Sequence, residues 1–310
     1  MNIEKIHARF LSSKLLLFIT VFAFIAIRLY PTYNHPELFF LAGSTLIQIG
    51  IAFFLLQINH IFNITQKRTF LPALFYLLFI GINPVFYFEL KGSIAALCVV
   101  LSYYFLFNSY QEPKSQINAL NISLLLVLGS LLWTPLLFFF PIFWIGFYHF
   151  QCFNTKVFFA NLTGFVIVYL FIFAWSLFKE DIKLFLSMLP QLESLIIVTK
   201  PELTDLEWIT CGLLIASCIL IGANLFLSNI SERVWTISVL RFFYFSAFVF
   251  FIFYFIQSEY KSTWGLITFI PVAFLSGHFF SRANNKIVHY LLILFFLFLV
   301  GIGIAQYISA

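Results

Sequence analysis

Two short polar segments hold side chains whose types could carry chemistry. Residues 28–37 read Arg-Leu-Tyr-Pro-Thr-Tyr-Asn-His-Pro-Glu, and residues 87–91 read Tyr-Phe-Glu-Leu-Lys. A carboxylate in such a segment can take a proton from a hydroxyl, a histidine beside it titrates near neutral pH, and a neighbouring cation can hold a phosphate. These patterns predict three catalytic candidates, Glu37, Glu89 and His35, and three substrate-binding candidates, Arg28, Lys91 and Tyr33.

The same residues also have a simpler structural interpretation. Glu37 begins an apolar run, and a negative charge stabilises the N-terminus of a helix. Arginine and tyrosine are common anchors at the surface of a membrane. Catalysis and helix anchoring therefore both remain open for the two segments.

Other chemical motifs are missing from the sequence. The cysteines (Cys98, Cys152, Cys211 and Cys218) form no C-x-x-C pair and no cluster with histidine, so we predict no metal site. Nucleotide-binding and zinc-protease patterns are also missing, and we predict no cofactor. The apolar runs contain no central Asp or Glu, which weakens a proton- or sodium-coupled transporter. Milder groups such as Gln48 are interpreted as hydrogen-bonding links between helices.

Composition sets the class of the protein. Of the 310 residues 62% are hydrophobic and 9% are charged, and the mean hydropathy is +1.02. Soluble domains have about 25% charged residues. The composition therefore excludes a soluble enzyme, a nucleic-acid-binding domain and a disordered chain. It predicts an all-α fold, a polytopic bundle of transmembrane helices.

The lengths of the apolar runs predict about eleven spans, since a spanning helix needs about 20 apolar residues. The predicted spans include 14–30, 37–59, 70–88, 93–109, 158–178, 208–228, 236–256, 263–281 and 286–307. The stretch 119–150 is too long for one span and is broken at Trp133-Thr134-Pro135. We predict a short helical hairpin there. One fused helix would instead give about ten spans.

The basic residues predict the orientation of the chain. Lys and Arg are more frequent at the ends that we assign to the inside, although fusing the hairpin would weaken that bias. We expect a first helix that is not cleaved and an N-terminus in the cytoplasm. The segment 179–207 has an apolar stripe at helical spacing, which favours an external interfacial helix over a plain loop. We expect one membrane domain over residues 1–310.

A resemblance covers about a tenth of the chain. The stretch from Asn118 to Pro141, followed by the basic Lys156, resembles the paired short helices of membrane glycosyltransferases of the C superfamily, which use polyprenyl-phosphate sugars. The whole chain also resembles an uncharacterised family of polytopic bacterial inner-membrane proteins, which carry a basic loop and Phe-Leu-Pro, here at 67–72. The glycosyltransferases place a catalytic acid in a long first external loop. Here that loop is short and Glu37 is its only acid.

Three functions follow as expectations. The first is a reduced, glycosyltransferase-like protein of the bacterial inner membrane, acting in lipid-linked glycan or envelope assembly. The second is a carrier or flippase for a lipid or small molecule, and the third is a non-catalytic subunit of a larger complex. The expected partners are membrane lipid, a polyprenyl-linked sugar and a protein in the membrane. We expect no nucleic acid.

Overall fold

The structure is a computed structural model that describes most of the chain. It covers residues 14–32, 38–65, 69–112, 114–180, 233–282 and 292–298, together with residues 208, 211, 212, 215, 219, 222, 290, 300, 301 and 304. No strand occurs within these residues, so the predicted all-α class is confirmed for them. The helices are α2 (Lys14–Thr32), α3 (Leu38–Phe62), α4 (Leu71–Ile82), α5 (Leu90–Phe107), α6 (Gln116–Ser130), α7 (Phe139–His149), α8 (Thr155–Phe178), α12 (Val234–Ile256) and α13 (Lys261–Arg282), with short 3-10 turns η1 (Pro84–Phe86), η2 (Thr134–Phe138) and η3 (Ser258–Tyr260).

Five of these helices are long and apolar enough to cross a membrane: α3, α5, α8, α12 and α13. A helix bonds its own backbone groups internally, which hydrocarbon requires of any spanning segment. The chain is therefore a membrane protein built from helices. The figure of about eleven spans stays a prediction.

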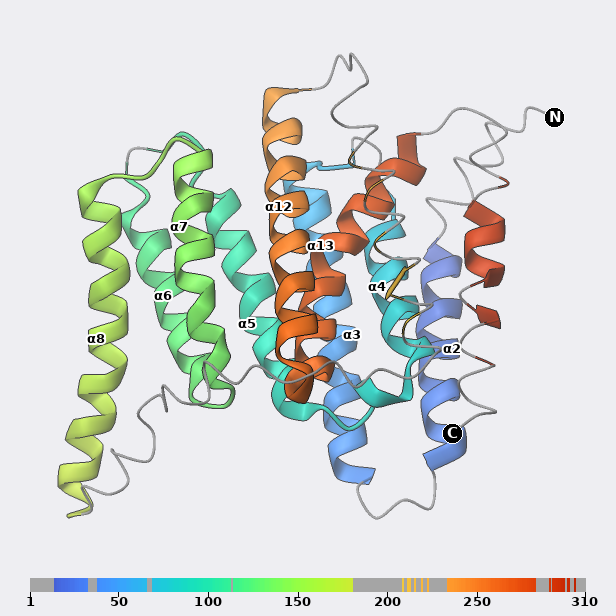
Figure 1. Cartoon of the computed structure of the whole chain (residues 1–310), viewed down its shortest axis with the longest axis horizontal. Helices are drawn as coiled ribbons and strands as arrows, with labels where there is room; N and C mark the ends of the chain where they lie inside the picture. The colour runs from blue at the N-terminus through green and yellow to red at the C-terminus, as the bar shows by residue number, and fades with distance from the viewer. Residues whose placement is uncertain are drawn as a thin grey trace. The chain divides into compact units, whose positions relative to one another are not determined.

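The helices gather into two compact units. The first unit comprises Met1–Ser93 with Lys200–Ala310, and it holds α2, α3, α4, α12 and α13. Within it, α4 packs against α2, α3 and α13, and α13 also packs against α12 (Figure 1). α4 and α13 are therefore the helices around which this unit is built.

Glycine and stacked aromatic rings let the helices of the first unit pack close together. A Cβ added to Gly277 of α13 would lie 2.9 Å from a ring carbon of Pro72 and 3.0 Å from its backbone nitrogen. Phe243 of α12 stacks on Phe274 of α13 with ring centroids 4.6 Å apart. Such close packing is what holds helices together in lipid, where the surroundings are as apolar as the core.

The second unit, Ile94–Thr199, contains the predicted helical hairpin. α6 ends at Ser130, the chain turns at residues 131–133, and η2 and α7 follow. Pro135 lies in the first turn of η2, where its missing N–H costs no hydrogen bond. The break predicted at Trp133-Thr134-Pro135 is therefore confirmed.

The start and the end of the hairpin lie side by side at one end of the second unit. The backbone N–H of Gln111, before α6, donates to the carbonyl of Phe150, after α7, at 3.3 Å. The hydroxyl of Ser115 donates to the carbonyl of Cys152, also at 3.3 Å. The two ends of the hairpin are thus tied to each other, and α6 and α7 run in opposite directions (Figure 1).

The span predicted over 70–88 was wrong as one continuous helix. α4 ends at Ile82 and has 12 residues, about 18 Å at 1.5 Å per residue. A proline disfavours a helical conformation in the residue before it, and Asn83 before Pro84 is extended, with φ −105° and ψ 116°. The Asn83 side chain then accepts a hydrogen bond from the N–H of Val85 and starts η1.

Three predictions fall wholly or partly outside the described residues. They are the interfacial helix over 179–207, the span over 208–228, of which single helical residues such as Trp208 are described, and the span over 286–307, of which residues 292–298 and four others are described and helical. The expectation of a single membrane domain stays a prediction.

Candidate functional site

The predicted site residues fall into two groups. Tyr33, His35 and Glu37 lie outside the described residues. Arg28, Glu89 and Lys91 are described, and the first two make specific contacts within the first unit. The two polar segments meet through Arg28 and Tyr87, which belong to different segments.

Arg28 is fully buried in α2 rather than lying in an external turn. Its guanidinium carbon lies 4.3 Å from the ring centre of Phe24 and 4.5 Å from that of Tyr87. Its NH1 donates a hydrogen bond of 3.2 Å to the hydroxyl of Thr45 on α3. Aromatic faces attract cations, and a guanidinium stacks well on them. Arg28 therefore places a buried guanidinium at the junction of α2, α3 and the segment after α4.

Tyr76 of α4 is a second polar group near this charge. Its side chain is fully buried, and its hydroxyl lies within electrostatic range of the Arg28 guanidinium. Within the described part of the chain, the Tyr76 hydroxyl has no hydrogen-bond partner. Tyr76 was not among the residues predicted from the sequence. Nothing in the residues around it distinguishes it from the other 13 tyrosines.

Glu89 lies half-buried just before α5 and accepts a hydrogen bond of 2.7 Å from the hydroxyl of Ser262 on α13. Its backbone carbonyl accepts from the Ser93 hydroxyl at 2.6 Å. Glu89 thus links the start of α5 to α13. Lys91, two residues later, is exposed. The Glu89 carboxylate is therefore engaged with α13, and its catalytic role stays a prediction.

A run of hydroxyl and amide groups on α3 holds the second polar segment in place. Ser44 donates to the carbonyl of Tyr87, and Gln48 donates to the carbonyl of Phe86 at 3.2 Å and to the hydroxyl of Ser93 at 2.9 Å. The interpretation of Gln48 as a link between helices is therefore confirmed. The network fixes Tyr87, one of the two rings that flank Arg28.

A large apolar cavity lies beside Arg28. It has a volume of about 500 Å³ and is lined by residues of α2 and α4, by Pro84 and Tyr87, and by three residues near the C-terminus. Phe24 and Tyr87, whose rings contact the Arg28 guanidinium, both form part of its wall. None of the described residues that line the cavity is charged. Its wall therefore suits a hydrocarbon chain better than a sugar.

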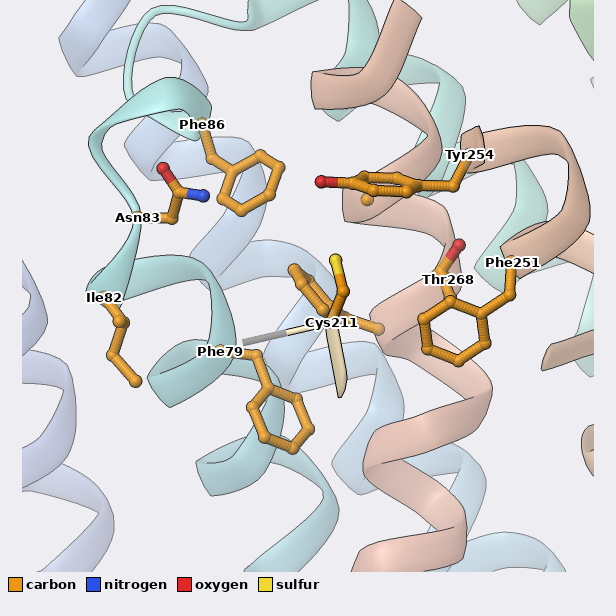
Figure 2. A pocket seen from close by; sticks show the side chains of 10 residues that line it. Phe79, Ile82, Asn83, Phe86, Cys211, Phe251, Tyr254 and Thr268 are labelled. Carbon is orange, nitrogen blue, oxygen red and sulfur yellow. The ribbon is translucent and has the colours of Figure 1, made fainter. Parts of the chain in front are cut away.

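A second, much smaller cavity lies between η1, α12 and α13. Its volume is about 30 Å³, and its wall includes Asn83, Cys211, Tyr254 and Thr268 (Figure 2). A cavity of this size has room for a water molecule, and these polar groups could bond it. It is too small for an organic ligand.

Clusters of metal-ligating side chains are a further feature to consider within the described residues. No group of three or more His, Cys, Asp or Glu side chains that could hold a metal ion occurs among them. Arg28 was among the residues predicted from the sequence, and Thr45 and Tyr76 were not. A signal was present for Arg28 because a charged residue in an apolar helix is rare and usually functional.

Comparison with known proteins adds no assignment: no protein-family model, no curated protein and no solved structure matches the chain.

Proposed function

We propose that this protein binds a membrane lipid in the cavity between α2 and α4, and that it acts as a lipid carrier or lipid-binding protein. The observation that supports this is the cavity itself, with its volume of about 500 Å³ and its apolar wall. Cavities that bind small ligands have volumes of about 300–1,000 Å³. A wall of this kind takes up hydrocarbon because apolar surface leaves water or the lipid headgroup region.

The polar groups in the wall are few and already engaged. The Thr20 hydroxyl donates to the carbonyl of Leu17 at 2.8 Å, and the Tyr87 hydroxyl donates to the carbonyl of Gly81 at 2.9 Å. A sugar needs several hydrogen-bonding groups in its site, and leaving its hydroxyls unpaired is costly. The wall therefore favours the chain of a lipid over a free sugar.

Ala23→Trp tests the proposal, because Ala23 is an exposed residue of α2 that lines the cavity and a large side chain there would fill it. Ala26→Trp is the matched control, since Ala26 is exposed on the same helix and does not line the cavity. The full chain in phosphatidylcholine nanodiscs is exposed to a photoactivatable fatty acid, and the labelled residues are identified by mass spectrometry. Label on α2 and α4 that is lost in Ala23→Trp and retained in Ala26→Trp supports the proposal. Equal labelling of both variants and the unmodified chain contradicts it.

A second candidate function is lipid-linked glycan processing, with Glu89 as the acid–base residue and a polyprenyl-linked sugar as the partner. The observation that favours it is a half-buried carboxylate in the second polar segment, two residues after Tyr87 of the cavity wall. Glu89→Gln keeps an oxygen for Ser262 and removes the charge. A normal glycan profile in this variant, in a strain where deletion of the gene alters that profile, excludes the role.

The cellular location belongs to the same proposal. The bias of Lys and Arg supports a cytoplasmic N-terminus, and we propose the bacterial inner membrane as the location. Fusing a reporter enzyme that is active only in the cytoplasm to the N-terminus tests it: activity is expected, and an inactive but intact fusion contradicts the orientation.

A further inference from the structure

Tyr76 has a buried hydroxyl that helix packing alone does not explain. Buried polar groups are nearly always hydrogen-bonded, and an orphaned one needs an explanation. The Tyr76 hydroxyl is such a group within the described part of the chain, and it lies close to a buried cation. A tyrosine hydroxyl and a guanidinium are both donors. A negatively charged oxygen is therefore the kind of group that both can bind.

The surroundings hold the Arg28 side chain in a fixed orientation. Phe24 and Tyr87 flank its guanidinium, and Thr45 accepts a hydrogen bond from its NH1. A planar guanidinium fixed in this way is suited to phosphate or carboxylate, which it binds with strong, charge-assisted hydrogen bonds. Thr45 donates its own hydroxyl to the carbonyl of Leu41 at 2.7 Å, so it positions Arg28.

Two side chains connect the Arg28 guanidinium to the large cavity. Phe24 and Tyr87 contact the guanidinium and also line the cavity of about 500 Å³. Tyr76 does not itself line the cavity, but Leu77, the next residue of α4, does. A molecule with an anionic head and an apolar chain can therefore meet both features at once.

We infer that the ligand is an anionic lipid, whose hydrocarbon chain occupies the cavity and whose phosphate or carboxylate lies between Arg28 and Tyr76. The inference rests on the proposed function, since it names the class of lipid that the cavity takes. It assigns a ligand-binding role to Tyr76, and it assigns Arg28 to the headgroup.

Tyr76→Phe is the most informative variant. It removes only a hydroxyl that has no partner in the described structure, so the fold should be as stable as before or more stable. Ser276→Ala is the matched control, because Ser276 of α13 is also buried with an orphaned hydroxyl among the described residues. Arg28→Gln removes the charge, and the Tyr76 variant keeps the test valid if Arg28→Gln does not fold.

The experiment measures competition against photoactivatable palmitic acid on the full chain in phosphatidylcholine nanodiscs. The competitors are palmitic acid, hexadecyl phosphate and methyl palmitate, which share one chain and differ in the headgroup. We expect both anions to compete at least about tenfold better than the neutral ester, and Tyr76→Phe and Arg28→Gln to remove that preference. Ser276→Ala should keep it. The better of the two anions identifies the headgroup as carboxylate or phosphate.

Two other outcomes overturn the inference in different ways. If all three competitors are equally effective and Ala23→Trp blocks them all, the cavity binds lipid whatever the charge of the headgroup. The proposed function then stands and the headgroup assignment fails. If none of the three competes and the cavity residues take up no label, both proposals fail.

Discussion

Helices α13 and α8 show two ways in which an apolar helix meets its surroundings. Within the most apolar stretch of each helix, 94% of the residues of α13 are buried but only 33% of those of α8. Yet α8 is the more apolar of the two. α13 contains several buried hydroxyls, including Thr268, which donates to the carbonyl of Trp264 at 2.6 Å.

The contrast reverses the rule for soluble proteins. In water the exposed surface is polar, whereas in a bilayer an exposed face must be apolar and the interior can hold polar groups that are hydrogen-bonded. α8 packs on α6 along one narrow stripe, where Gly164 approaches Ser123. The outward residues of α8, such as Phe171 and Phe178, are exposed. Burial, and not hydropathy, therefore separates the structural helices from the lipid-facing ones.

The largest effect should come from enlarging a small residue on α13. Gly277→Leu would press a side chain into the ring and backbone of Pro72, and we expect it to destabilise the fold by about 3 kcal/mol. Gly50→Leu on α3 is the control, because nothing lies within 4 Å of a Cβ added there. Thermal unfolding in detergent measures both. Equal unfolding temperatures for the two variants would contradict the packing of α13 on α4.

A pair of substitutions within α8 sharpens the contrast. Gly164→Leu would bring a side chain to 2.7 Å from Ser123 and should cost about 2 kcal/mol. Phe171→Leu on the exposed face should change stability by less than about 0.5 kcal/mol. The same unfolding assay applies. A large effect of Phe171→Leu would show that this face of α8 is covered by a partner.

The loop between α7 and α8 offers a pH-dependent comparison. Burial raises the pKa of the Cys152 thiol from 9.0 to about 12, and the thiol donates to the carbonyl of Phe147 at 3.4 Å. Because the folded pKa lies above the unfolded one, the contribution to stability is complete below pH 9 and is lost as the pH rises towards 12. We expect a loss of about 1 kcal/mol by pH 9.5, absent in Cys152→Ala. The folded chain should also react slowly with a maleimide at pH 8, and fast reaction would show that Cys152 is accessible.

The smallest effect is expected at the end of α8. Glu180 has φ 55°, a left-handed conformation that costs energy for any residue with a Cβ. Glu180→Gly should stabilise the fold by about 0.5 kcal/mol after the extra chain entropy of glycine is subtracted. Lys179→Gly is the control, because Lys179 has φ −87° and gains nothing. If both glycines destabilise equally, Glu180 does not have this left-handed conformation in solution.

The lengths of the apolar runs predicted most helices well. The prediction of 93–109 compares with α5 at Leu90–Phe107, and the predicted break before Pro135 separates α6 from η2. Both follow from local physics, namely helix length and the missing N–H of proline. The prediction of 70–88 failed because an apolar run conceals a helix end, which here depends on Asn83 adopting an extended conformation before Pro84.

The site was harder to predict than the helices. Arg28 could be selected from its charge, but its burial against Phe24 and Tyr87 depends on contacts between residues far apart in the chain. Tyr76 could not be selected at all. Lipid and protein interior are equally apolar, so hydropathy does not indicate which side of α4 faces inward.

The hairpin of α6 and α7 also makes the chain tolerant of change. Because Gln111 is hydrogen-bonded to Phe150 and Ser115 to Cys152, the chain enters and leaves the hairpin at the same place. If the hairpin were shortened, lengthened or lost, the helices that follow it would keep the direction in which they cross the membrane. A membrane protein could therefore remodel this part through evolution without inverting the rest of its topology.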